Sequence, residues 1–315
     1  MSTPWRPDAD LDTLRQRAAL CARTRSFFAQ RDVLEVTTPV LSRFPIPTPN
    51  IQSFATQAPA RFLRTSPELA HKRLLAADSG DIYELGPVFR QGEQGTRHNS
   101  EFTLLEWYRI GFDEYELMQE VNAYLCAMIP ALTEPPEVAS YAQAVKRSTG
   151  LDIWSADLEQ LRELLETVTA LPAGELHRDD LLDLVFSLMV APTFAADRVT
   201  LIHDYPASQA VLAALSDTDS RVARRFEAFV GPLELGNGFY ELRDAQEQRR
   251  RFERDNQIRK QLGQPACAAD TAFLAALDAG LPECAGVAVG FDRVVMLATG
   301  KLDIAQTLTF AFDTA

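Results

Sequence analysis

The spacing of apolar and polar positions predicts helices and strands in an irregular order. From Leu11 to Arg31, apolar side chains recur at helical spacing, which predicts a long amphipathic helix. Residues 81–91 and 101–112 alternate well enough to form a long antiparallel hairpin, with residues 93–100 as its loop. Further strands are expected at 33–42, near 61–64, at 198–206, within 225–242 and from 286. A loop is expected at 43–60. Helices are expected through Lys72, at 113–129, 156–168, 178–190 and 243–263, and after 290.

This order of elements favours an α+β fold. Strands and helices do not alternate as regular βαβ units, so we expect an antiparallel sheet flanked by helices. We predict one domain over residues 1–315, with a mostly helical insertion at about 131–200. The segment 243–263 is so rich in charge that its helix should present a solvated face.

Composition narrows the class of protein. The 315 residues are 46% hydrophobic and 24% charged, which is typical of a soluble globular chain. The net charge of −13 argues against broad contact with a nucleic-acid backbone. No secretory leader or membrane-spanning stretch is expected. The four cysteines are scattered and form no C-x-x-C pair, which indicates reduced thiols in a cytosolic protein.

The predicted hairpin carries an unusual mixture of residues, "FRQGEQGTRHNSEFTLLEWYR". Arg90 stands near the end of its first strand, and Phe102 near the start of the second. Because side chains on one strand face repeat every two residues, Arg90, Phe102, Glu106 and Tyr108 can address one ligand. Arginine suits a phosphate and phenylalanine stacks on a base. An exposed, ion-paired hairpin is the alternative interpretation.

The stretch "GVAVGFDRVVML" predicts a strand that runs into a helix. Gly286 and Gly290 let a ligand or another backbone come close. Arg293 falls in the first helical turn, where the macrodipole disfavours a cation unless it faces an anion or covers a ring. A surface arginine paired with Asp292 is the alternative.

The stretch "RFEAFVGPLELGNGFYEL" contains Glu227, Glu234 and Glu241 at intervals of seven. Glycines interrupt the strands between them, so the carboxylates can converge. Carboxylates together with substrate phosphates commonly hold Mg²⁺. Three exposed glutamates are the alternative in so acidic a chain.

The joint order of these stretches resembles the class II aminoacyl-tRNA synthetases. "FFAQRDVLEVTTPVLS" resembles their motif 1, the hairpin motif 2, and "GVAVGFDR" motif 3. "TSPE", "RHNSEFTLLEWY" and "ELGNGFYEL" are similar to the lysyl-tRNA synthetase branch. Those synthetases carry an N-terminal anticodon-binding β-barrel, whereas motif 1 begins here near residue 27. The chain therefore resembles the catalytic-domain-only paralogues that join (R)-β-lysine to elongation factor P.

This resemblance implies ATP-dependent activation of (R)-β-lysine as an acyl-adenylate, then transfer to a lysine of elongation factor P. It implies a cytoplasmic homodimer that uses ATP and Mg²⁺, without tRNA or a membrane. Its implied ATP-binding residues are Arg90, Gln91, His98, Asn99, Phe102, Glu234, Leu235, Gly290 and Arg293, of which Arg90 and Arg293 are catalytic. Its implied amino-acid site comprises Ser66, Pro67, Glu68, Tyr108, Asn237, Glu241 and Ala288, and its metal site Glu227 and Glu234.

One position departs from the family pattern. Motif 2 normally reads arginine, any residue, glutamate, but the third position here is Gly92, followed by Glu93. Either Glu93 substitutes after a small shift, or nucleotide binding is weakened. The rival hypotheses are a weakened paralogue that binds and regulates, a ligase that attaches lysine to another acceptor, and an amidating enzyme similar to ammonia-dependent asparagine synthetase.

Overall fold

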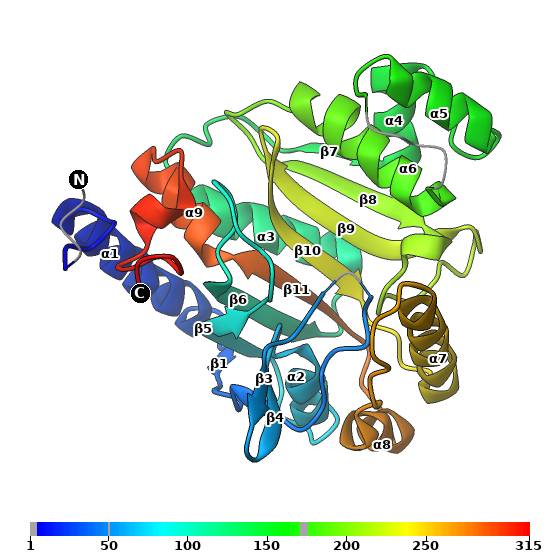
Figure 1. Ribbon diagram of the computed structural model, residues 1–315. Coiled ribbons are helices and arrows are strands. Elements are labelled where there is room, and N and C mark those ends of the chain that lie inside the picture. Colours follow the sequence, from blue (N-terminus) through cyan, green and yellow to red (C-terminus); the bar gives the residue numbers. More distant parts are fainter. Residues whose placement is uncertain (1–4, 50, 171–175) are drawn as a thin grey trace. The chain divides into compact units, whose positions relative to one another are not determined.

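The computed structural model describes residues 5–49, 51–170 and 176–315 (Figure 1). Position 50 of the predicted loop and 171–175 of the predicted insertion lie outside these residues. The described chain divides into two compact units, residues 1–113 with 241–315 and residues 114–240. The predicted insertion falls within the second unit, and each unit is described by itself.

The first unit contains a sheet in the order β1-β5-β6-β11. Strand β1 runs parallel to β5, whereas β5, β6 and β11 are successively antiparallel. A small sheet has the order β2-β4-β3; β2 and β4 fall where strands were predicted, whereas β3 falls in the predicted loop. The bounds are β1 Leu34–Glu35, β2 Leu41–Ser42, β3 Ala55–Gln57, β4 Ala60–Leu63, β5 Ile82–Phe89, β6 Glu101–Ile110 and β11 Cys284–Gly290.

Helices cover both faces of this sheet (Figure 1). Phe28 of α1 stacks on Tyr83 of β5, with ring centroids 4.3 Å apart, and meets Trp107 of β6 edge-on. Helix α2 lies over the opposite face, where His71 contacts Glu84. The bounds are α1 Leu11–Ala29, α2 Glu68–Leu75, α7 Ala245–Gln261, α8 Thr271–Ala279 and α9 Phe291–Thr299, with a 3-10 turn η4 at Ile304–Thr307.

The second unit contains strands in the order β10-β9-β8-β7. The first three are antiparallel, and β7 runs parallel to β8. Its core is aromatic: Tyr141 stacks on Phe186, 5.0 Å between centroids, beside Tyr205 and Phe229. The bounds are α3 Glu114–Met128, β7 Glu137–Ser140, α4 Tyr141–Thr149, α5 Leu158–Glu166, α6 Arg178–Val185, β8 Thr200–Pro206, β9 Val222–Val230 and β10 Leu233–Tyr240, with short helices η1 Phe186–Val190, η2 Ala191–Thr193 and η3 Ala207–Gln209.

The α+β prediction is confirmed, with corrections in detail. The strand predicted at 33–42 consists of two short strands, and β7 and α8 were not predicted. Helix α7 forms as expected and presents exposed side chains such as Arg250, while Arg251, Phe252 and Arg259 are buried. All four cysteines are free. No helix within the described ranges is long and apolar enough to cross a bilayer.

Candidate active site

One face of the first unit's sheet carries most of the predicted site. Glu84 of β5 pairs with Glu106 of β6, and Glu106 with Ala288 of β11. Because alternate residues share a face, Phe102 and Tyr108 lie on the same side as Glu106. The residues that β11 contributes to this face are small: Cys284, Gly286, Ala288 and Gly290. The face therefore has room above β11 for long side chains and a ligand.

Arg90 and Phe102 come together as predicted. The Arg90 guanidinium lies 5.1 Å from the Phe102 ring centroid, a cation–π contact. Its Nε donates to the Thr65 carbonyl at 3.3 Å, and its Nη1 lies 3.4 Å from Glu93 Oε1. A positioned guanidinium beside an aromatic ring is suited to a phosphate next to a base.

Gly92 has a positive φ of +85°, which glycine adopts without strain. A side chain there would meet nothing within 4 Å, so conformation rather than space favours glycine. The carboxylate near Arg90 comes from Glu93 instead. That Glu93 replaces the missing carboxylate in binding the nucleotide stays a prediction.

Arg293 is held against the hairpin loop. Its Nη2 lies 2.7 Å from His98 Nε2, and its Nε donates to the Arg97 carbonyl at 3.2 Å. Burial and the neighbouring guanidinium lower the pKa of His98, so its neutral ring can accept this hydrogen bond. Arg293 occupies the first turn of α9, as predicted, and Gly290 caps that helix.

Asn99, predicted to bind the nucleotide, has a structural role in the fold. Its Nδ2 donates to the Glu101 carbonyl at 2.6 Å, and its Oδ1 accepts the Phe312 amide at 3.0 Å. These bonds tie the hairpin loop to the C-terminal segment. The Gln91 side chain is exposed, and its backbone amide donates to the Gln52 carbonyl.

Ser66, Pro67 and Glu68 form the entry to α2. Pro67 is the N-cap residue, and Ser66 Oγ accepts the Glu68 amide at 2.9 Å. The same hydroxyl donates to Glu106 Oε2 at 3.1 Å, joining the helix start to β6. A cavity of about 490 Å³ opens beside this turn and is lined by, among others, Ser66, Glu68, Arg43 and Arg73. A small polar molecule has room there.

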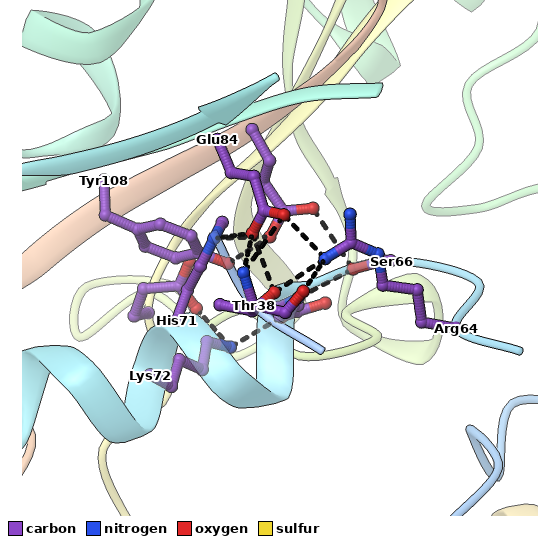
Figure 2. Close-up of polar contacts among 10 residues, drawn as sticks. Thr38, Arg64, Ser66, His71, Lys72, Glu84 and Tyr108 are labelled. Atoms are coloured by element: carbon purple, nitrogen blue, oxygen red, sulfur yellow. Dashed lines mark hydrogen bonds and ion pairs between the residues drawn. The ribbon is translucent and has the colours of Figure 1, made fainter. Parts of the chain in front are cut away.

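The structure gathers ionisable side chains above the sheet face (Figure 2). We call them the buried charge cluster. His71 and Lys72 of α2 are fully or almost fully buried. The members are Arg64, Glu68, His71, Lys72, Glu84, Glu106 and Glu241.

Lys72 is the centre of one half of the cluster. Its Nζ lies 2.6 Å from Glu68 Oε1 and 2.6 Å from Glu241 Oε2. Burial opposes its charge, but the two carboxylates raise the pKa of Lys72 overall. Burial also raises the pKa of Glu68, and raises that of Glu241 to about 8. Two carboxylates share one ammonium, so this half favours a second cation.

Glu84 is the centre of the other half. Burial disfavours its charge, yet hydrogen bonds from His71 and Thr38 and the ion pair with Arg64 lower its pKa to about 2. Arg64 Nη1 lies 2.7 Å from Glu84 Oε1, and Thr38 Oγ1 donates to Glu84 Oε2 at 2.7 Å. Glu84 is thus a satisfied, ionised carboxylate.

Tyr108 and Glu106 connect the two halves. The Tyr108 hydroxyl donates to Glu106 Oε1 at 2.9 Å, and burial, then Glu106, raise the pKa of Tyr108 far above its usual value. Gly286 lies across from Tyr108 in the register, and a methyl group there would lie 2.3 Å from the ring. Tyr108 and Glu241 were both predicted for the amino-acid site. Tyr108 contacts the cluster through Glu106, and Glu241 is one of its members.

In the second unit, a β-bulge brings the other predicted residues to one face. Asn237 of β10 pairs with Glu227 of β9, and Glu234 with Phe229, with a register shift between Glu234 and Gly236. Glu227 already accepts the Tyr205 hydroxyl at 2.7 Å and pairs with Arg225. Leu235 is buried within the bulge.

These carboxylates satisfy part of what Mg²⁺ requires. Glu227 and Glu234 offer hard oxygen ligands on one face, which fits an ion that also takes phosphate oxygens and waters. Across the described ranges, no group of three or more histidine, cysteine or acidic side chains is placed to hold a metal alone. The arrangement suits a metal that arrives with a nucleotide.

Sequence reasoning did not assign several members of the cluster to the site. Glu106 was noted on the hairpin face but given no role, and Arg64, His71, Lys72 and Glu84 were not considered. One signal was available, because Glu68 and Lys72 are four residues apart on one helix and so are expected to meet. The remaining contacts depend on tertiary structure.

Comparison with known proteins identifies relatives over nearly the whole chain. Residues 5–314 match the profile of the family described as tRNA synthetases class II (D, K and N). A Proteus mirabilis protein named elongation factor P–(R)-beta-lysine ligase is 46% identical, with 97% of each chain covered. Proteins of the same name from Klebsiella pneumoniae (45%; 99% of this chain and 98% of the relative) and Histophilus somni (43%; 100% and 99%) are similarly close.

Proposed function

The chain belongs to the class II tRNA synthetase family (D, K and N), and on that premise we propose that it is an AMP-forming ligase. It activates (R)-β-lysine with ATP and transfers the aminoacyl group to a lysine side chain of elongation factor P. The names of its relatives support this substrate and acceptor. One observation carries the proposal. The same side of the first unit's sheet has the Arg90–Phe102 pair and a buried cluster that favours an added ammonium.

The first step forms an acyl-adenylate. The substrate carboxylate attacks the α-phosphorus of ATP, a new C–O–P linkage forms, and the bond to the pyrophosphate leaving group breaks. Arg90 binds the α-phosphate, Phe102 and Arg293 enclose the adenine, and His98, Asn99, Gln91, Leu235 and Gly290 complete the nucleotide site. Mg²⁺, held by Glu234 and Glu227, would neutralise phosphate charge when bound. Positioning and charge neutralisation supply the catalysis.

The amino-acid site holds the substrate by its ammonium groups. Tyr108 and Glu241 face the side-chain ammonium, while Ser66, Pro67, Glu68 and Asn237 orient the other polar end, and Ala288 shapes the wall. Supporting this assignment, Glu241 and Glu68 have one lysine between them, so when both are ionised they have an excess negative charge that a substrate ammonium would neutralise.

In the second step, a neutral amine of the acceptor attacks the adenylate carbonyl. An amide bond forms, AMP leaves with the bonding electrons, and the amine loses a proton. We further propose that the ligase is a cytoplasmic homodimer that acts without tRNA. Two facts are consistent with this: the chain is strongly acidic, and its four cysteines are free.

The test measures ATP–pyrophosphate exchange with (R)-β-lysine, lysine and aspartate, followed by the intact mass of elongation factor P. We expect (R)-β-lysine to support exchange best, and elongation factor P to gain one β-lysyl group while tRNA remains unmodified. Arg90→Ala should abolish exchange, whereas Arg250→Ala, on the exposed side of α7, should not. Near-normal exchange by Arg90→Ala would overturn the site. No exchange by the wild type would favour the binding or regulatory hypothesis.

A further inference from the structure

His71 lies between the two halves of the buried charge cluster (Figure 2). Its side chain has no exposed surface. Nε2 lies 3.0 Å from Glu84 Oε2, and Nδ1 lies 3.5 Å from Glu106 Oε1. The ring also meets Tyr108 edge-on, with centroids 5.5 Å apart. Both ring nitrogens therefore face carboxylate oxygens from different strands.

This geometry favours protonation of both ring nitrogens, with a hydrogen bond from Nε2 to Glu84 and an ion-pair contact between Nδ1 and Glu106. An ionised carboxylate only accepts hydrogen bonds, and a neutral imidazole has one donor nitrogen and one acceptor nitrogen. A neutral ring would direct a lone pair at one of the two buried carboxylates. A doubly protonated ring can donate to both. Burial alone would lower the pKa of His71, but Glu106 and Glu84 together raise it.

The charge count shows what an imidazolium does for the site. The cluster contains four carboxylates, Glu68, Glu84, Glu106 and Glu241, and two permanent cations, Arg64 and Lys72. With all four carboxylates ionised and His71 charged, the cluster has one uncompensated negative charge, which one ammonium neutralises. Without that ammonium, a proton on Glu241 takes its place, in line with a pKa raised to about 8. With a neutral His71, it has two, and a second buried carboxylate would have to take up a proton.

The His71 imidazolium also holds Glu106 in place. The Glu106 carboxylate accepts from Tyr108 at 2.9 Å and from Ser66 at 3.1 Å, both of them predicted amino-acid site residues. His71 is the cation beside it, and is itself held by Glu84, which Arg64 and Thr38 fix. A rigid chain of contacts thus runs from α2 and β5 to the site.

We propose that His71 is a positioning and specificity-determining residue: a buried imidazolium, clamped between Glu84 and Glu106, that limits the amino-acid site to one uncompensated negative charge. The inference rests on the proposed function for the substrate, a diamino acid bound through an ammonium. It assigns His71 no contact with the substrate. The residue acts through Glu106.

The direct test is ¹⁵N NMR of the full-length protein labelled in its histidines, of which the chain has four. The His71 signals, assigned by elimination from the variants His98→Gln, His177→Gln and His203→Gln, should show both nitrogens protonated at pH 7.5. A neutral ring would overturn the proposal. This measurement reads His71 in the wild-type protein and does not depend on its activity, so it remains informative if His71→Gln fails to fold.

The functional test compares kinetic constants in ATP–pyrophosphate exchange. In His71→Gln, the KM for (R)-β-lysine should rise about 10- to 100-fold, as expected for the loss of a charge-assisted contact on a buried carboxylate, with the KM for ATP within about twofold. His177→Gln, the same substitution at an exposed histidine, should change neither. An unchanged amino-acid KM, or equal rises in both KM values, would overturn the proposal. Lack of exchange by the wild type would instead refute the proposed function.

Discussion

Gly286→Ala is the substitution whose effect the structure fixes most closely. A methyl group at this position would lie 2.3 Å and 2.4 Å from Tyr108 Cε1 and Cδ1, and 2.7 Å from Glu241 Oε1. Ordinary van der Waals contact begins at 3.4 Å, so the ring must retreat by about 1 Å. Tyr108 is buried and bonded to Glu106, and Glu241 is paired with Lys72, so neither can swing aside freely.

The expected result has two components. Overpacking should lower the free energy of unfolding by about 1–3 kcal/mol. Because a displacement of about 1 Å at a positioned group can cost about 100-fold, the KM for (R)-β-lysine in ATP–pyrophosphate exchange should rise by a factor of this order. The KM for ATP should change little, since Arg90 and Phe102 are not touched.

Gly80→Ala is the matched control for Gly286→Ala. Gly80 has φ +74° and nothing within 4 Å, so alanine there is strained without crowding any side chain. It should destabilise the fold by about 1–2 kcal/mol and leave both KM values unchanged. Urea unfolding and exchange kinetics of both variants separate stability from the site. An unaltered amino-acid KM in Gly286→Ala would refute the role of Tyr108 and Glu241.

Further expectations concern the buried charges and the motif 2 turn. The pKa of Glu241 is raised to about 8, so this carboxylate becomes ionised as pH rises from 6 to 8. The KM for (R)-β-lysine should therefore fall over this range, by at most about tenfold per pH unit. A flat pH profile would argue against an ionised Glu241 as ligand. Lys72→Met leaves Glu68 and Glu241 without their cation and should cost about 3–5 kcal/mol in urea unfolding at pH 7.5; a stable variant would contradict the pairing. Glu84 has a pKa of about 2 in the folded state, below its ordinary value. Its ionised form stabilises the fold by at most about 3 kcal/mol above pH 4.5, and this stabilisation is lost as pH falls through 2. In thermal unfolding, the difference in stability between wild type and Glu84→Gln should shrink over that range. Gly92→Glu should lower stability by about 1 kcal/mol without accelerating exchange, and a faster exchange would show that the missing carboxylate matters.

Local patterns predicted the hairpin and the faces of its side chains well. Alternation in 101–112 determines which side chains share a face, so the sequence alone places Phe102 and Tyr108 on the same face. Arg293 falls in the first turn of α9 because the glycine-rich end of β11 precedes it. In both cases the signal lies within a few residues of the element that it describes.

The buried charge cluster could not be predicted in the same way. The contact between Lys72 and Glu241 joins a helix to a segment far along the chain, and it depends on which strands become neighbours. His71 is one of several helical positions that a periodic pattern marks as buried. The neighbouring sequence does not distinguish a histidine between two carboxylates from a histidine in an apolar core. The glycines indicated only that the strands are interrupted, and the bulge that places Glu234 and Asn237 on one face followed from the register.

Stability alone does not account for so many buried charges. A buried ion pair is often no more stabilising than well-packed apolar residues of the same volume. Here α2 directs Glu68, His71 and Lys72 toward the sheet, at spacings of three and four residues, so one helical face supplies one carboxylate and two cations. The sheet side supplies three more carboxylates and one arginine, which leaves one negative charge over when all the carboxylates are ionised. A site that is incomplete by one cation is costly for the fold by itself and is completed by a ligand that carries an ammonium.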